Sequence, residues 1–129
     1  DAGHSLNPAL DEGKIEGGFV QGAGWLTTEE LIYDKDGALL THAPSTYKIP
    51  ACSDRPYRLN INLYEGDGNR SETIHRSKAV GEPPLMLGIS VFLALADALK
   101  GMGRDNSYPE INAPATTERV LMAIQAQLK

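Results

Sequence analysis

The sequence has 129 residues, of which 41% are hydrophobic and 22% charged, so it has the size and apolar content of one globular domain or part of one. Its formal net charge of −5 argues against a general nucleic-acid binder, which needs a basic face. The longest apolar run, residues 83–99, is interrupted by Gly88 and Ser90 and is shorter than the roughly 20 residues of a membrane-spanning helix. We therefore expect no nucleic-acid partner and no membrane.

The single cysteine, Cys52, has no partner for a disulfide within the chain or for a zinc-type cluster. We therefore expect a reducing, cytoplasmic compartment and no metal ligated by protein side chains. Cys52 itself is interpreted either as a reactive thiol or, more often for this residue type, as a small buried hydrophobic residue. The chain starts at Asp1 without a signal peptide, and we interpret this start as a cut end.

A helix is predicted to begin at Asn7, which can cap free N–H groups, with Pro8 in its first turn, and to continue to Leu26. Glycines inside this helix each cost up to about 1 kcal/mol relative to alanine. They are Gly13, Gly17, Gly18, Gly22 and Gly24. Pairs four residues apart share a helix face, so they admit the close approach of another backbone or of a flat ligand. Periodicity alone favours tight packing of the helix against a sheet.

The next part of the chain carries signals for β structure. Residues 31–41 predict a β-hairpin with its turn at 34–37. Three prolines within and at the end of residues 42–56 predict a long connection. Residues 57–64 alternate strictly between apolar and polar side chains, which is typical of a half-buried strand, and a short strand is expected at 73–74.

Two further helices are predicted in the C-terminal half. Pro83 and Pro84 open an apolar helix over residues 85–100, which is apolar on nearly every side and is therefore expected to be buried in something larger than this chain. After a polar loop at 104–113, Thr116 caps a final amphipathic helix over residues 117–128. The mixture of helices, hairpin and strand predicts an α+β fold over residues 1–129.

Glu82 is the candidate active residue. Gly81 before it leaves room for a ligand, and Pro83 and Pro84 after it stiffen the backbone at the start of a helix. A general base must be fixed, ionised and accessible, and this position meets these requirements. The alternative is that Glu82 only caps its helix, and residue type and position alone favour that interpretation.

The residues around Glu82 belong to a set of motifs that occur in order along the chain. They are SLNPA at 5–9, EGGFVQG at 16–22, PSTYKIP at 44–50, SKAVGEPPL at 77–85 and APAT at 113–116. The run at 77–85 resembles the active-site motif of the xanthine dehydrogenase family, in which the glutamate is the catalytic base. The other motifs resemble the same family, in the C-terminal part of its molybdenum-cofactor-binding subunit. Pro83 and Pro84 favour the xanthine branch over aldehyde oxidoreductases and carbon monoxide dehydrogenases.

The resemblance implies a reaction and a cofactor. Xanthine or hypoxanthine would be oxidised to urate with oxygen from water, with Glu82 as general base. Gln21 would form a hydrogen bond on the cofactor side, and Gly81 would lie beside the metal centre. Molybdenum would be held by the dithiolene of molybdopterin and not by protein side chains. Electrons would leave through iron–sulfur clusters and FAD, on partner domains or subunits, to NAD.

The resemblance also implies that the chain is part of a larger molybdopterin-binding domain. Most of the cofactor cradle and the purine-binding residues would lie upstream, so we expect the isolated chain to be inactive, to expose an apolar patch and to self-associate. Its partners would be the remainder of the subunit and an iron–sulfur/FAD subunit. Lys14 stands where the family is expected to have Gln, and helical phase is expected to place Lys14 away from Gln21. The alternatives are an inactive structural or binding module, or a hydroxylase of aldehydes or other heterocycles.

Overall fold

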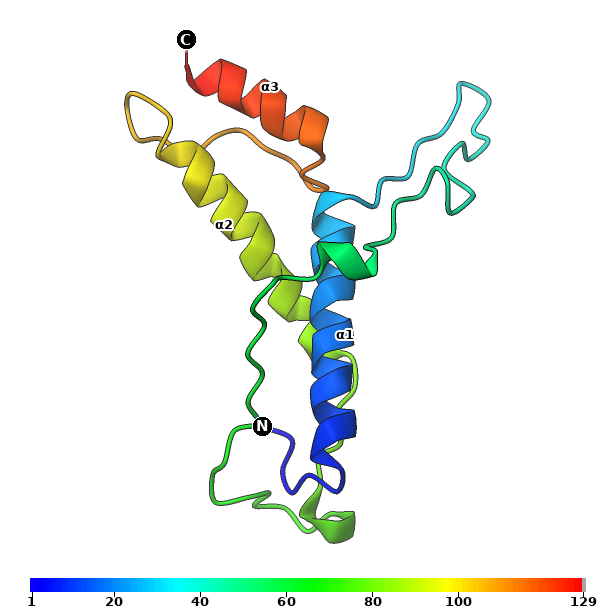
Figure 1. Cartoon of the computed structure of the whole chain (residues 1–129), viewed down its shortest axis with the longest axis vertical. Helices are drawn as coiled ribbons and strands as arrows, with labels where there is room; N and C mark the ends of the chain where they lie inside the picture. The colour runs from blue at the N-terminus through cyan, green and yellow to red at the C-terminus, as the bar shows by residue number, and fades with distance from the viewer. Residues whose placement is uncertain (129) are drawn as a thin grey trace.

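A computed structural model describes residues 1–128 and shows an open, mainly helical arrangement (Figure 1). Its α-helices are α1 (Pro8–Thr27), α2 (Ile89–Lys100) and α3 (Thr117–Gln127), and its short 3-10 helices are η1 (Cys52–Asp54), η2 (Ile74–Arg76) and η3 (Pro83–Gly88). The upright helix in Figure 1 is α1, and α2 leans against it with α3 above. The centre of the structure is therefore the crossing of α1 with η3 and α2.

The predicted first and last helices are confirmed. The side chain of Asn7 accepts a hydrogen bond from the N–H of Leu10 at 3.2 Å, with Pro8 in the first turn of α1. The Thr116 hydroxyl oxygen accepts from the N–H of Arg119 at 3.3 Å at the start of α3. The helix predicted at 85–100 is divided at Gly88 into η3 and α2.

Glycines bring α1 and η3 into backbone contact. A Cβ atom at Gly22 would overlap the carbonyl oxygen of Leu85, and one at Gly88 would overlap the backbone of Gly22. A Cβ at Gly18 would lie 2.9 Å from the Cβ of Pro84. These glycines therefore serve close packing, but against a helix and not the expected sheet. Gly13 has nothing within 4 Å of its Cβ position and faces open space.

The predicted β-hairpin is reduced to a turn. Tyr33 and Leu39 form one isolated antiparallel bridge, and the N–H of Asp34 donates to the carbonyl of Ala38 at 2.9 Å. The Asp34 carboxylate also accepts the N–H groups of Asp36 and Ala38. The turn thus forms at the predicted place, but no paired strand extends from it within the described residues.

The strand predicted at 57–64 does not form, because this segment has no neighbouring segment to pair with among residues 1–128. Leu59, Ile61 and Leu63 are half-buried, and the asparagines between them are exposed, so the alternation is kept. A strand needs a neighbour for its backbone hydrogen bonds, and residues 1–128 provide none for this segment. The β component of the α+β prediction is therefore not confirmed, and the fold of this chain is mostly helical.

The long connection at 42–56 packs along α1 from its middle to its C-terminal end. The Thr28 hydroxyl donates to the carbonyl of Lys48 at 2.8 Å, and Arg55 forms an ion pair with Glu16. A hydrogen bond to the buried Glu29, followed by desolvation and the negative charge of Glu29, raises the pKa of Tyr47 above its ordinary value. Cys52 in this connection is free and exposed, so its interpretation as a small buried hydrophobic residue was wrong.

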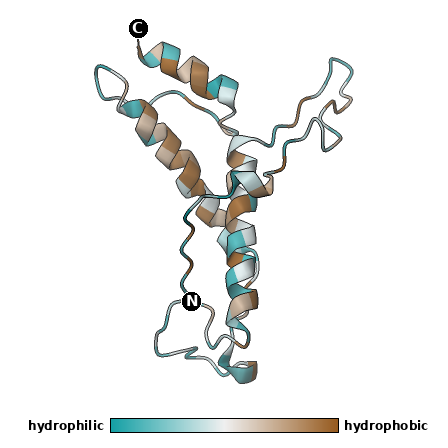
Figure 2. Cartoon of the chain, in the orientation of Figure 1, coloured by the Kyte–Doolittle hydropathy of each residue, from teal (hydrophilic) through white to brown (hydrophobic). Residues whose placement is uncertain are grey.

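The core is small, and the apolar helix is not covered within this chain. The buried apolar residues are Ala2, Ala96, Leu99, Ala115 and Ala123. Leu87 is 52% exposed and Leu93 is 59% exposed, so the expected burial of this helix is not met by residues 1–128. Figure 2 shows the largely hydrophobic composition of α2. By length and composition alone, Pro83–Lys100 is apolar enough to cross a membrane, with a mean hydropathy of 1.4. Core helices of soluble proteins share this composition.

Candidate functional site

Gln21, Gly81 and Glu82 line one open pocket between α1 and the segment that leads into η3. The pocket has a volume of about 420 Å³. Its lining residues are Lys14, Gly18, Gln21, Trp25, Val80, Gly81, Glu82 and Leu85. The fold thus brings Gln21 into the same pocket as the adjacent residues Gly81 and Glu82, which are distant from it in the sequence. These are the three site residues that the resemblance implies.

One face of α1 forms the first wall of this pocket. It carries Lys14, Gly18, Gln21 and Trp25, whose spacing of three or four residues places them on the same side of a helix. The expectation that Lys14 faces away from Gln21 was wrong, because seven residues are almost two full turns and return to the same face. Both side chains are exposed.

The second wall is fixed by η3. The N–H of Leu85 donates to the carbonyl of Glu82 at 2.9 Å, and Pro84 is buried against Gly18. The Glu82 side chain makes no capping hydrogen bond to η3, which counts against the capping interpretation. The backbone of Glu82 is therefore held by packing, while its carboxylate is exposed beside the pocket.

A strained segment leads into Glu82 from the other side. His75, Arg76 and Ala79 have left-handed backbone angles, with φ of 53°, 57° and 58°. This conformation costs roughly 1–2 kcal/mol for a residue with a Cβ, so it persists only where the surroundings enforce it. Ser77 provides one such constraint, because its side-chain oxygen accepts the N–H of Ala79 at 3.0 Å.

The N-terminal arm provides a second constraint on the same segment. Gly3 and Ser77 form an antiparallel bridge, and the N–H of Lys78 donates to the carbonyl of Ala2 at 2.9 Å. The Lys78 ammonium also pairs with Asp1. The sequence does not predict this pairing of residues 1–3 with residues 77–78, because residues so far apart in the chain leave no local pattern.

The residues of the pocket fit an organic cofactor that carries its own metal. Gln21 offers an amide and Lys14 an ammonium, which are hydrogen-bond donors for a polar or anionic ligand. Gly81 has nothing within 4 Å of its Cβ position, so the rim is open beside Glu82. Among residues 1–128, no group of three His, Cys, Asp or Glu side chains is placed to hold a metal ion.

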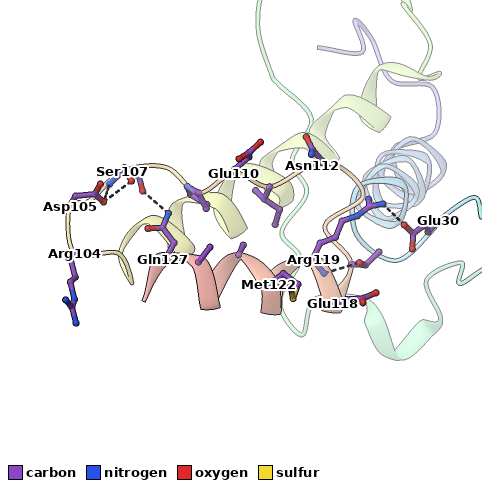
Figure 3. Close-up of a pocket in the computed structure, with 15 residues that line it drawn as sticks. Glu30, Arg104, Asp105, Ser107, Glu110, Asn112, Glu118, Arg119, Met122 and Gln127 are labelled. Atoms are coloured by element: carbon purple, nitrogen blue, oxygen red, sulfur yellow. Dashed lines mark hydrogen bonds and ion pairs between the residues drawn. The ribbon is translucent and has the colours of Figure 1, made fainter. Parts of the chain in front are cut away.

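A larger cavity of about 910 Å³ lies elsewhere, between α3 and the loop at 104–113 (Figure 3). Arg119 crosses one end of it and pairs with Glu30 at 2.5 Å. Gln127 closes the other end by donating to the carbonyl of Ser107 at 3.3 Å. Arg119 thus ties α3 to the segment that follows α1, and Gln127 ties it to the loop. The cavity contains none of the residues predicted to act in catalysis or cofactor binding.

Comparisons with known proteins identify relatives over nearly the whole chain. Residues 1–56 match the family model of the molybdopterin cofactor-binding domain. The chain is 48% identical to xanthine dehydrogenase 1 of Arabidopsis thaliana over 95% of its length, and 44% identical to aldehyde oxidase 1 of Bos taurus over 97%. It spans about 10% of the length of each of these relatives.

A solved structure shares the fold. The crystal structure of quinoline 2-oxidoreductase from Pseudomonas putida 86 matches with a TM-score of 0.77 and 30% sequence identity. The match covers 98% of this chain and 15% of that chain. The arrangement of α1, η3 and α2 is therefore one that a much longer oxidoreductase contains.

Proposed function

Because the chain belongs to the xanthine dehydrogenase family of molybdenum hydroxylases, we propose that it supplies the catalytic base and part of the cofactor pocket in such an enzyme. The base is Glu82, and the cofactor-binding residues are Gln21 on α1 and Gly81 on the segment before η3. The observation that carries this proposal is the single pocket lined by all three residues. The reaction of the complete enzyme would be oxidation of xanthine or hypoxanthine to urate with water-derived oxygen.

Molybdopterin with its molybdenum would supply, when bound, the electron acceptor and the activation of the water-derived oxygen. Gln21 would orient this cofactor through its side-chain amide, and Gly81 would let it approach the backbone closely. Iron–sulfur clusters, FAD and NAD would act on partner domains or subunits. The remainder of the subunit would complete the pocket around the purine, since the pocket formed by α1 and the segment before η3 is open.

Glu82 would act by accepting a proton at a carboxylate oxygen. Its exposed side chain lines the pocket, while η3, which begins at the next residue, packs against Gly18 and Gly22 of α1. A base whose backbone is held in this way stays in the orientation that proton transfer requires. Such fixed orientation of a catalytic group is a main source of rate enhancement. Release of the proton to solvent would regenerate the carboxylate.

Replacing Glu82 with Gln in the complete enzyme tests this assignment. The variant keeps the volume and most hydrogen bonds but cannot accept the proton, so we expect kcat to fall by roughly 10²- to 10⁴-fold with little change in melting temperature. Glu72→Gln is the matched control, because Glu72 is an exposed carboxylate outside the Glu82 pocket. Activity of E82Q within about tenfold of wild type would overturn the proposal.

A second candidate substrate class is aldehydes or other heterocycles. The observations that favour it are the 44% identity to an aldehyde oxidase and the structural match to a quinoline oxidoreductase. Pro83 and Pro84 after the glutamate favour the xanthine branch. The ratio of kcat/KM for xanthine, an aromatic aldehyde and quinoline, measured with the complete enzyme, decides between the two classes.

A further inference from the structure

We propose that Ser77 is a positioning residue for Glu82, holding the backbone turn that aims the carboxylate into the pocket. The proposal rests on the function proposed above for Glu82. It concerns a residue outside the pocket lining, which acts through the backbone and not by touching a ligand.

The first step of the argument is the hydrogen bond from Ala79. Its N–H donates to the Ser77 side-chain oxygen at 3.0 Å, two residues back along the chain. This geometry is a serine turn, in which a side chain imitates a backbone carbonyl. Ala79 has a φ of 58°, a conformation that alanine rarely adopts without such support. Loss of the acceptor therefore releases Ala79 toward an extended conformation.

The second step is that Ser77 is itself fixed. The Asn69 amide donates to the Thr73 hydroxyl oxygen at 2.8 Å, and the Thr73 hydroxyl donates to the carbonyl of Ser77 at 2.7 Å. Asn69 is only 7% exposed, so this network begins inside the structure. On its other side Ser77 pairs with Gly3 of the N-terminal arm. Ser77 therefore presents its hydroxyl from a rigid support.

The third step connects Ala79 to Glu82. Only Val80 and Gly81 separate them, so the backbone direction at Ala79 sets the direction in which the chain enters Glu82. Beyond Glu82, η3 is fixed by its backbone contact with α1. A change at Ala79 therefore alters the entry of the chain into Glu82 and turns its carboxylate, while η3 stays packed on α1.

The test measures Ser77→Ala in the complete enzyme. We expect kcat to fall about tenfold or more, because small displacements of a reacting group reduce rates strongly, while KM changes less than about threefold and the melting temperature stays nearly constant. Ser77→Thr and Ser77→Asn should restore activity, since each keeps a side-chain oxygen that can accept the N–H two residues on. Ser71→Ala is the matched control, because the backbone N–H of Ser71, not its hydroxyl, bonds to Asn69.

A double-mutant cycle with Glu82→Gln distinguishes positioning from a general structural role. If Ser77 acts through Glu82, Ser77→Ala should cause no further loss of kcat in the E82Q background. An equal fold-loss in both backgrounds, or full activity of S77A, would overturn the proposal. Wild-type activity of E82Q alone would instead overturn the assignment of the base. If S77A does not fold, Ser77→Cys, a side chain of similar shape with a weak acceptor, takes its place under the same criteria.

Discussion

The two sides of the η3–α2 segment differ in what covers them. The inner side meets α1 backbone to backbone through Gly18, Gly22 and Gly88, with no space for an added side chain. The outer side presents large apolar side chains to solvent. They are Met86, Leu87, Ile89 and Leu93, between 40% and 59% exposed. The inner contact is complete within this chain, whereas the outer surface lacks the cover that such residues normally have.

This difference shows where the candidate site belongs. Glu82 stands at the start of η3, on the part that the inner contact holds, so this chain alone fixes its backbone. The pocket beside it is open, and the apolar surface next to it is uncovered. The backbone of Glu82 is thus held by local packing, while the pocket beside it stays open within the described residues.

The largest effect is expected from filling the inner contact. Gly22→Val places three carbons where the carbonyl of Leu85 lies, and the backbone cannot move aside without separating α1 from η3. We expect the free energy of unfolding to fall by more than about 3 kcal/mol. Chemical denaturation of the complete protein measures it.

Gly13→Val is the control for the same substitution in the same helix. Gly13 faces open space, so its replacement should change stability by only about 0.5 kcal/mol, with valine slightly favoured over glycine in a helix. Equal losses at the two positions would show that helix propensity, and not the backbone contact, determines the effect.

A smaller effect is expected when the outer surface is made polar. Ile89 and Leu93 lie one turn apart on α2 and are 40% and 59% exposed. We expect this chain to self-associate through such residues, and the double variant Ile89→Lys/Leu93→Lys to weaken the association about tenfold or more. Sedimentation over a concentration series gives the dissociation constant. A wild-type chain that stays monomeric at high concentration would contradict this expectation.

Removing the cap of α3 tests a feature outside the η3–α2 segment. Thr116→Ala deletes the acceptor for the N–H of Arg119 at the start of α3, with an expected loss of about 1 kcal/mol. Thr117→Ala, at the first position of the helix itself, is the control and should have little effect. The melting temperatures of the two variants provide the comparison, and equal values would contradict the assigned cap.

The features that the sequence predicted correctly are local. Asn7 and Thr116 cap their helices because a cap needs only the N–H groups two or three residues ahead. The turn at Asp34 formed for the same reason. Paired strands did not form at 57–64, since a strand depends on a neighbour that the pattern of its own residues cannot provide.

The candidate site was predictable in part. Glu82, Gln21 and Gly81 were found through their motifs, and the structure places them in one pocket. Lys14 lies on the same face of α1 as Gln21, contrary to the expectation, because seven residues make almost two helical turns. The role proposed for Ser77 could not be predicted, because the left-handed φ of Ala79 that its hydroxyl supports is visible only in three dimensions.

The smallest expected effect is a pH dependence in the loop at 104–113. The Ser107 hydroxyl and backbone N–H donate to the Asp105 carboxylate at 2.8 and 3.1 Å, and these hydrogen bonds lower the pKa of Asp105 below its ordinary value of 3.8. Because the folded pKa is lower than the unfolded one, the stabilisation is present above the unfolded pKa and is lost as the pH falls through the folded pKa. Titration of the Asp105 carboxyl by NMR should show this lowered midpoint, and Ser107→Ala should return it toward the ordinary value. A midpoint that S107A leaves unchanged would mean that Ser107 does not set the charge state of this loop.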